Sequence, residues 1–297
     1  MTSALLDAVR RYAVAHADRH GVARTPIAGL TVLSATAPSH LQYAISSPLV
    51  ALVLQGAKRV TMGSRTFDFG AGESLLIAAD VPTASQITQA TVTAPYFSLV
   101  LDLDRQLIAQ LSVEMGALES GGRGPVSVQS TAADVAEAAL RLMRLLERPG
   151  ALPVLQQQLV REMHYWLMTG THGGAIRELG VASSRGQRIA RAVAMIRAHY
   201  AEPLPVQRLA AAAGMSQSAF HEHFRAVTSL TPLQFQKRMR LIEARRRMLD
   251  EGASIANAAF SVGYESVPQF TREYARTFGL PPARDMKAAG ERMRASA

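Results

Sequence analysis

The feature that most constrains this chain of 297 residues is an internal repeat with an offset of 50 near the C-terminus. The segment FHEHFRAVTSLTP, which begins at Phe220, aligns with FTREYARTFGLPP, which begins at Phe270. The segments before them also correspond, because an Ala-rich stretch ends at Gly214 in one copy and at Gly263 in the other. An internal repeat usually means that one structural unit is built more than once.

Each copy has the pattern of two short helices joined by a tight turn. Glycine ends the first helix at low cost because it adopts the left-handed conformation. Ser216 or Ser266 then offers a hydroxyl that caps the second helix, and two aromatic residues four apart hold that helix against the alanines of the first. We therefore predict two helix-turn-helix units, at about 204–227 and 254–278, whose second helices enter the major groove of DNA.

The stretch between the two copies, Leu233 to Asp250, is rich in arginine and has apolar residues at helical spacing. A helix of this length spans about 27 Å. Successive major-groove entries on one face of B-DNA lie about 34 Å apart. One linking helix can therefore hold two reading helices about one turn of DNA apart.

Because the aromatic residues face inward, we expect the opposite face of each second helix to meet DNA. The candidate DNA-contacting residues are Gln217, Ser218, His221, Glu222 and Arg225 in the first copy, and Val267, Gln269, Arg272 and Arg276 in the second. Arg272 is expected to pair with guanine, Gln269 with adenine and Glu222 with a cytosine amino group. Arg225 and Arg276 lie later on their helices and suit phosphate contacts. For each of them the alternative is an ordinary solvated side chain.

The distribution of charge favours a polyanionic partner for the C-terminal third. Of the formal net charge of +9, residues 1–186 carry +1 and residues 187–297 carry +8. The alternatives are a basic surface that aids solubility and a scaffold protein that meets an acidic protein or membrane surface. A membrane-binding helix would place apolar and basic residues on opposite faces of one long helix. Here the basic residues belong to a repeat with capped turns, which favours DNA.

The composition excludes several other classes of site. With no cysteine, the chain has no disulfides, thiolate metal sites or cysteine nucleophiles. No apolar run approaches the roughly 18 residues of a membrane span, and no signal-peptide pattern is visible. We expect a cytoplasmic protein without a membrane partner.

Residues 25–105 have short apolar runs separated by turn residues, which predicts a small β-barrel or sandwich. The residues expected to face the interior of this barrel are Leu52, Leu54, Phe67, Phe69, Leu75, Ile77, Phe97, Leu99 and Leu101. Such a barrel either holds a ligand or is packed solid. Residues 131–169 then follow a helical period with a break at Pro149-Gly150, so we expect a helical hairpin that covers the barrel or forms a dimer seam.

A metal-dependent enzyme is the rival interpretation of the barrel. Its chemistry needs two or three histidines that converge on one face. Residues 25–110 contain only His40, with Glu73 as a carboxylate, and no nucleophile elbow, phosphate loop or zinc-protease motif occurs in the chain. We therefore expect no enzyme activity, no cofactor and no metal.

Through the two helix-turn-helix motifs and the helix between them, residues 189–287 resemble the AraC/XylS class of transcription regulators. The segment IANAAFSVGYESVPQFTREYARTFGLPP carries most of the resemblance. One difference lies after Pro282, where many members have Pro-x-x-Tyr-Arg and this chain has Ala283-Arg284-Asp285-Met286. Residues 25–110 are similar to the N-terminal domain of one branch of that class, mainly through VLQGAKRVTMGSRTFDFGAGE.

The resemblance implies an α+β multidomain protein that regulates transcription. We expect a cupin-like regulatory β-barrel with its helical hairpin over residues 1–169, a linker over 170–187, and an all-α DNA-binding domain over 188–290. The implied partners are double-stranded DNA and RNA polymerase, together with a small-molecule effector and a second copy of the chain.

Overall fold

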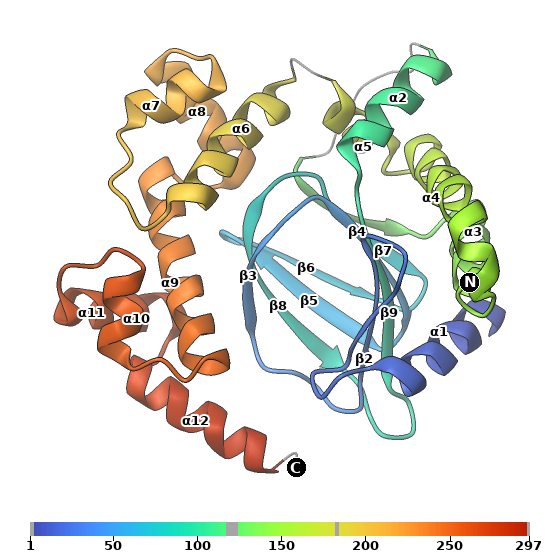
Figure 1. The fold of residues 1–297 in the computed structure, drawn as a ribbon, viewed down its shortest axis with the longest axis horizontal. Helices are drawn as coiled ribbons and strands as arrows, with labels where there is room; N and C mark the ends of the chain where they lie inside the picture. The colour runs from blue at the N-terminus through green and yellow to red at the C-terminus, as the bar shows by residue number, and fades with distance from the viewer. Residues whose placement is uncertain (1–2, 117–123, 182–183, 296–297) are drawn as a thin grey trace. The chain divides into compact units, whose positions relative to one another are not determined.

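The computed structural model describes residues 3–116, 124–181 and 184–295. The chain divides into two compact units, Met1–Gln187 and Arg188–Ala297, each of which has its own core (Figure 1). The first unit is rich in β-structure and the second is all-helical, which confirms the predicted α+β multidomain fold.

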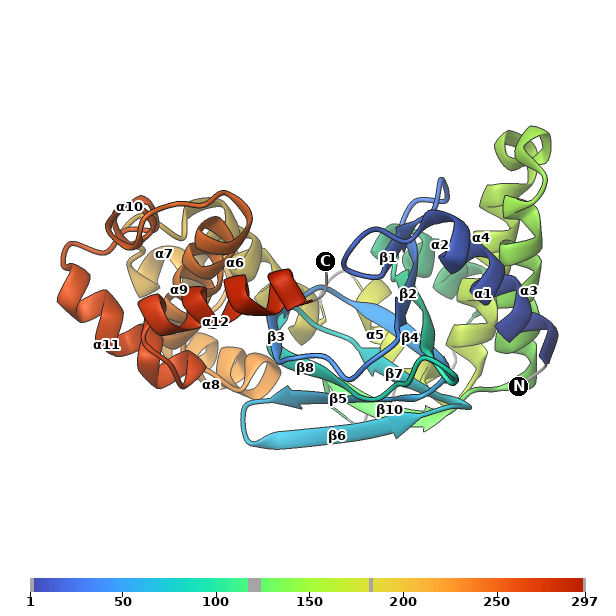
Figure 2. The ribbon, with the colours of Figure 1, turned by 90° about the horizontal axis from the view of Figure 1, so that it is seen from below.

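Two antiparallel sheets form the centre of the first unit. The six-stranded sheet has the order β1-β2-β9-β4-β7-β10, and the four-stranded sheet has the order β3-β8-β5-β6 (Figure 2). The strands are β1 Val22–Arg24, β2 Leu30–Ala35, β3 Gln42–Ser46, β4 Leu49–Gln55, β5 Ala57–Met62, β6 Arg65–Gly70, β7 Glu73–Ile77, β8 Val81–Gln89, β9 Tyr96–Asp102 and β10 Val126–Ser130. The helices are α1 Ser3–His16, α2 Arg105–Met115, α3 Ala133–Leu146, α4 Leu152–Thr169 and α5 Gly173–Gly180, with a short 3-10 turn at Pro149–Ala151.

One face of the six-stranded sheet packs against the helices, and this corrects the expected interior of the barrel. Leu52 of β4 pairs with Leu99 of β9, and both belong to the core shared with α1 and α3. The same core contains Leu54, Phe97 and Leu101. These five residues therefore face the helices, whereas Phe67, Phe69, Leu75 and Ile77 lie on the faces between the two sheets. Both faces of the sheet are buried, so alternation along a strand does not reveal which face meets the other sheet.

The predicted helical hairpin is present, since α3 and α4 pack against each other. The stretch expected to be a linker, however, contains α5. The side chains of Ala175, Ile176 and Leu179 are buried in the core of the first unit. These residues recur at helical spacing and form one apolar face. Burial of this face stabilises the helix although glycines surround it.

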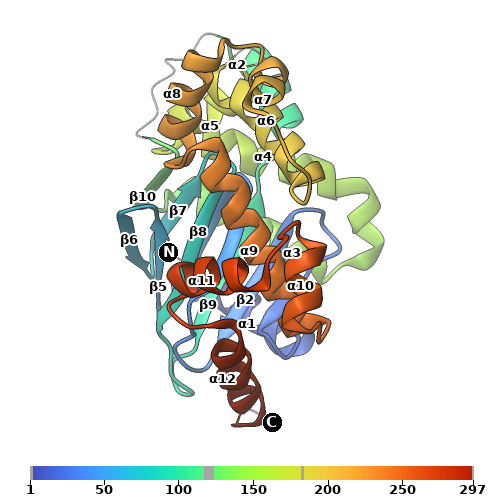
Figure 3. The same cartoon turned by 90° about the vertical axis from the view of Figure 1, so that its left-hand side faces the viewer.

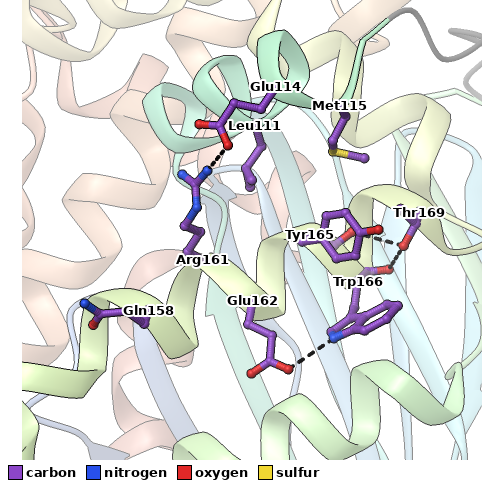
Figure 4. Close-up of a pocket in the computed structure, with 9 residues that line it drawn as sticks. All are labelled: Leu111, Glu114, Met115, Gln158, Arg161, Glu162, Tyr165, Trp166 and Thr169. Atoms are coloured by element: carbon purple, nitrogen blue, oxygen red, sulfur yellow. Dashed lines mark hydrogen bonds and ion pairs between the residues drawn. The ribbon is translucent and has the colours of Figure 1, made fainter.

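A pocket of about 730 Å³ lies between α2 and α4 (Figure 4). Arg161 of α4 forms an ion pair with Glu114 of α2 beside it, and Trp166 Nε1 donates a hydrogen bond to Glu162. The exposed ring of Tyr165 lies next to that of Trp166. This side of α4 therefore combines apolar rings with paired charges.

Seven helices make up the described part of the second unit. They are α6 Arg185–His199, α7 Val206–Ala213, α8 Gln217–Thr228, α9 Pro232–Asp250, α10 Ile255–Ser261, α11 Val267–Phe278 and α12 Pro282–Ala295. The long helix α9 links the α7–α8 pair to the α10–α11 pair (Figure 3).

The turn chemistry predicted for both copies is confirmed. Gly214 ends α7 with a left-handed φ of 61°, and Ser216 Oγ accepts a hydrogen bond from the Ala219 amide at the start of α8. In the second copy Gly263 has a φ of 88°, and Ser266 Oγ accepts from the Gln269 amide. Both second helices therefore begin at a side-chain cap.

Aromatic side chains pack each second helix against its neighbours. In the first copy Phe224 contacts Phe220 and Phe235 edge to face, with centroid distances of 5.3 and 5.5 Å. In the second copy Phe270 lies between Tyr264 and Tyr274, at 5.3 and 5.4 Å. The three edge-to-face contacts and the tilted Phe270–Tyr274 pair add to the burial of large rings, which stabilises the packing of both second helices.

The two turn glycines allow a matched test of this architecture. A Cβ at Gly263 would lie 2.0 Å from the Ala201 carbonyl oxygen, whereas the nearest atom at Gly214 is 3.7 Å away. Gly214→Ala should cost about 1 kcal/mol from its left-handed backbone alone, and Gly263→Ala about 2 kcal/mol more because backbone must move. Thermal unfolding of both variants measures this, and equal losses would show that the close approach is absent.

Two buried histidines predict a pH dependence of the first unit. His172 Nε2 lies 3.0 Å from Ser74 Oγ, while His164 Nε2 accepts a hydrogen bond from the Asp104 amide at 3.1 Å. Burial lowers the pKa of both imidazoles. In the unfolded chain the histidine pKa is about 6.5, so as the pH falls the unfolded chain binds these protons before the folded chain does. The free energy of unfolding therefore decreases as the pH drops below about 6.5.

We expect the melting temperature to decrease when the pH is lowered from 7.5 to 5.5. The decrease should be smaller in the variant His164→Gln. The control is His40→Gln, which changes an exposed histidine of the same unit and should leave the pH dependence intact. An equal pH dependence in the wild type and both variants would contradict the account. The measurement is differential scanning calorimetry across this pH range.

Candidate nucleic-acid interface

Helix α8 has one buried face and one exposed face. Phe220 and Phe224 are fully buried. The residues predicted to contact DNA from this helix, Gln217, Ser218, His221, Glu222 and Arg225, are all exposed. The structure therefore brings these five side chains to one accessible surface of the helix.

Helix α11 repeats this arrangement with one difference. Phe270 and Tyr274 are fully buried, and the candidates Gln269, Arg272 and Arg276 are exposed. The fourth candidate, Val267, is half-buried and packs against the core of the second copy. Gln269 Nε2 also donates a hydrogen bond of 3.3 Å to Glu273 one turn later.

The basic residues of α9 are largely bound within the unit itself. Arg240 donates hydrogen bonds to the carbonyl oxygens of Tyr200 and Gly263, at 2.6 and 2.9 Å. Arg246 and Arg247 form ion pairs with Glu243, at 2.8 and 3.1 Å. Much of the positive charge on α9 is therefore part of the scaffold.

The arginines on α8 and α11 behave differently. Among the described residues, Arg225, Arg272 and Arg276 have exposed guanidinium groups without a hydrogen bond or ion pair. Arg208 in α7 and Arg284 in α12 are also exposed and have no hydrogen bond or ion pair from their guanidinium groups to any described residue. These two arginines were not predicted from the sequence. A sequence cannot show that Arg240 and Arg245 are paired, because their carbonyl and carboxylate partners come from distant parts of the chain.

A buried ionic cluster holds α11 in place. Arg245 Nε of α9 lies 2.8 Å from Asp285 Oδ2 of α12, and the Tyr274 hydroxyl of α11 donates to the same oxygen at 2.6 Å. Asp285 is only 6% exposed. Burial, and then the hydrogen bond to Asp285, raise the pKa of the Tyr274 phenol, so the hydroxyl stays protonated and donates. Three helices thereby share one hydrogen-bonded carboxylate.

A second cluster also joins α9 to α11. Glu273 accepts from Lys237 Nζ at 2.9 Å and from the Tyr264 hydroxyl at 2.8 Å. Hydrogen bonds from Lys237, Tyr264 and Gln269 lower the pKa of Glu273 despite its partial burial, so it is an anionic acceptor. Sequence reasoning missed both Glu273 and Asp285, although Asp285 lies where the chain departs from the Pro-x-x-Tyr-Arg pattern.

Neither a metal centre nor a membrane span is found in the described parts of the chain. No three His, Asp or Glu side chains come together there in a way that would hold a metal ion. None of the helices described combines the length and apolar character needed to cross a membrane.

Comparison with known proteins shows which domain family each unit matches. Residues 26–175 match the family described as AraC-type transcriptional regulator N-terminus, and residues 209–288 match a helix-turn-helix domain. VirF of Yersinia enterocolitica, a virulence regulon transcriptional activator, is 24% identical over 242 residues, which cover 78% of this chain and 86% of VirF. The regulator GbdR of Pseudomonas aeruginosa is 30% identical over 90 residues, which cover 30% of this chain and 24% of GbdR.

A solved structure has a similar fold. ToxT of Vibrio cholerae, crystallised with (E)-4-(8-methylnaphthalen-1-yl)but-3-enoic acid bound, superposes with a TM-score of 0.58 at 8% identity, over 88% of this chain and 98% of ToxT. The matched domains and relatives are transcription regulators and not enzymes. The chain belongs to the family of AraC-type transcriptional regulators and carries their helix-turn-helix DNA-binding domain.

Proposed function

We propose that the chain recognises a specific DNA sequence by placing α8 and α11 in two successive segments of the major groove. One observation carries the proposal: within the described part of the chain Arg225, Arg272 and Arg276 on α8 and α11 are exposed and unpaired, while most arginines of α9 are bound internally. A phosphate or guanine is the partner that such guanidinium groups suit best.

Each candidate side chain has a chemical role in this proposal. Arg272 makes a bidentate contact to guanine, Gln269 pairs with adenine and Glu222 accepts from a cytosine amino group. Arg225 and Arg276 bind phosphates, which position the helices without reading sequence. The remaining candidates are Gln217, Ser218 and His221, which supply further polar contacts, and Val267, whose exposed part suits a thymine methyl group. We add Arg208 and Arg284 as phosphate contacts, because both are exposed and unpaired among the described residues.

The length of α9 supports two groove contacts by one chain. Its 19 residues span about 28 Å, and the groove repeat is about 34 Å. The reading helices lie beyond its ends in the chain, so a separation close to one DNA turn is within reach. The DNA-binding part proposed here extends over residues 188–290.

For the first unit we propose a regulatory role in the cytoplasm: it binds a small-molecule effector and contributes to a homodimer. The small acid bound to ToxT supports an effector within this fold. Three apolar side chains of α4, Val154, Leu155 and Tyr165, are exposed, and Tyr165 lines the pocket of Figure 4, which supports a dimer seam. RNA polymerase is the further partner that transcription regulation implies.

The DNA-reading role predicts different outcomes for two arginines of α11. Arg272→Ala should weaken binding to the preferred sequence by about 1–3 kcal/mol and relax the preference at one position. Arg276→Ala should weaken binding to all sequences and reduce the slope of log affinity against log salt by about 1. Fluorescence anisotropy with specific and mutated duplexes over a range of salt concentrations measures both effects.

The control is Arg246→Ala, which removes a positive charge of the same unit that is paired with Glu243 and Glu251. DNA affinity should change little in this variant. If all three variants lost the same affinity on every sequence, the positive charge of the unit would be sufficient and base reading by α11 would be refuted.

A further inference from the structure

A second pocket of the first unit, next to the pocket of Figure 4, has a polar lining. Its volume is about 520 Å³, and Arg161 borders both pockets. The walls come from the loop between β1 and β2, the end of β9, the first turns of α2 and the middle of α4. Eight of the thirteen lining residues are polar or charged: two aspartates, four glutamines, an arginine and a histidine. A pocket of this size with convergent polar groups is typical of a small-molecule site.

This pocket is separate from the space between the two sheets. None of the described residues that line it belongs to the four-stranded sheet. It also lies on a different side of α4 from the exposed Val154 and Leu155, which do not line it. The pocket is therefore neither the interior of the barrel nor part of the apolar surface of α4.

Hydrogen bonds tie the walls of the pocket to one another. His164 Nε2 of α4 accepts a hydrogen bond from the Asp104 amide at 3.1 Å, so the imidazole proton lies on Nδ1, which donates to the Val160 carbonyl at 2.8 Å. The Asp102 amide at the end of β9 donates to the Gly29 carbonyl of the loop at 2.9 Å. Because these segments are held together without a ligand, a ligand that fits the pocket binds with little ordering cost.

The charge available to a ligand in this pocket is negative. Arg161 is already paired with Glu114 of α2 (Figure 4). Burial lowers the pKa of His164, so the imidazole is neutral at neutral pH. Asp104 Oδ1 caps α2 by accepting from two backbone amides of its first turn. The Asp102 carboxylate has no hydrogen bond or ion pair with any residue in the described part of the chain.

Asp102 is the group that a ligand would compensate. Part of its side chain is exposed, yet burial of the rest raises the pKa of the carboxyl group. Arg105, three residues later, is paired with Asp80 at 2.8 Å. An opposite charge placed close to a carboxylate favours its ionised form. The pocket therefore favours a cation over an anion.

Four glutamines supply the neutral part of the lining. Gln106 and Gln110 lie one turn apart on α2, and Gln156 and Gln157 are neighbours on α4. None of their side-chain amides forms a hydrogen bond with another described residue. Each amide offers two N–H donors and a carbonyl acceptor. These groups suit a ligand that carries several hydrogen-bonding atoms besides its charge.

We propose that this pocket binds a short aliphatic amine with a second hydrogen-bonding end, such as a diamine or an amino-guanidine. Its ammonium group lies at the Asp102 carboxylate, its methylene chain contacts Leu107 and Val160, and its other end bonds to glutamine amides of α2 and α4. A charge-assisted hydrogen bond to Asp102 is the strongest single contact in this arrangement. The proposal concerns ligand binding alone, so it does not depend on the effector role or on DNA reading.

The contact to Asp102 is tested by NMR of the full chain labelled with carbon-13 aspartate, which contains nine aspartates. Putrescine and agmatine are the probes, and the diol with the same carbon chain as putrescine is the neutral control. We expect at least one of the two cations, and not the diol, to shift the Cγ signal of Asp102. The bound cation should also lower the Asp102 pKa by about one unit or more, because it favours the carboxylate. Asp102→Asn identifies the signal.

The affinity of the amine is then compared between variants by isothermal titration calorimetry. Asp102→Asn should weaken it at least about tenfold, and Gln110→Leu, which removes one amide, by about threefold to tenfold. The control is Asp68→Asn, which removes a carboxylate of the same unit that is paired with Arg59 outside the pocket, and it should leave the affinity unchanged.

Three results would overturn the proposal. The first is an Asp102 signal that neither cation shifts, and the second is an unchanged affinity in Asp102→Asn. The third is an equal loss of affinity in Asp102→Asn and Asp68→Asn, which would show that the amine responds to the overall charge of the unit and not to this pocket.

Discussion

The geometry of the DNA-binding unit depends on hydrogen bonds and ion pairs that join α9 to the elements around it. Arg245 shares Asp285 with Tyr274, and Lys237 shares Glu273 with Tyr264. Arg245 and Asp285 are largely buried, and removing one partner of such a pair is costly because the other charge then remains buried and uncompensated. Directional contacts of this kind fix the rotation and position of α11 more tightly than apolar packing alone.

This use of charge divides the basic residues of the unit into two groups. Arginines of α9 such as Arg240 and Arg246 are bound to carbonyl or carboxylate oxygens. Arg225, Arg272 and Arg276 on the reading helices remain unpaired among the described residues. A net charge of +8 over residues 187–297 therefore overstates the charge available to DNA, and the location of the unpaired arginines is the more informative quantity.

The sequence predicted the local features of the helical unit well because short-range chemistry determines them. The left-handed Gly214, the caps at Ser216 and Ser266, and the inward Phe220 follow from turn conformation, capping and helical spacing. The roles of Asp285 and Glu273 could not be predicted, because their charged partners Arg245 and Lys237 lie 40 and 36 residues away in the chain. The same limit applies to the first unit, where Leu52 and Leu99 face the helices, and to α5, which packs into the core although glycines surround it.

Recognition of two groove segments by one chain requires that α9 hold α8 and α11 about one DNA turn apart. Selection of bound sites from a random DNA library with the full chain at fixed salt tests it, followed by re-spacing of the selected site by 5 base pairs. We predict two sequence blocks about 10–10.5 base pairs apart, centre to centre, and a large loss of affinity on re-spacing, because the second block then turns to the opposite face of the duplex. A single block, or an affinity that does not depend on the spacing, would contradict the account.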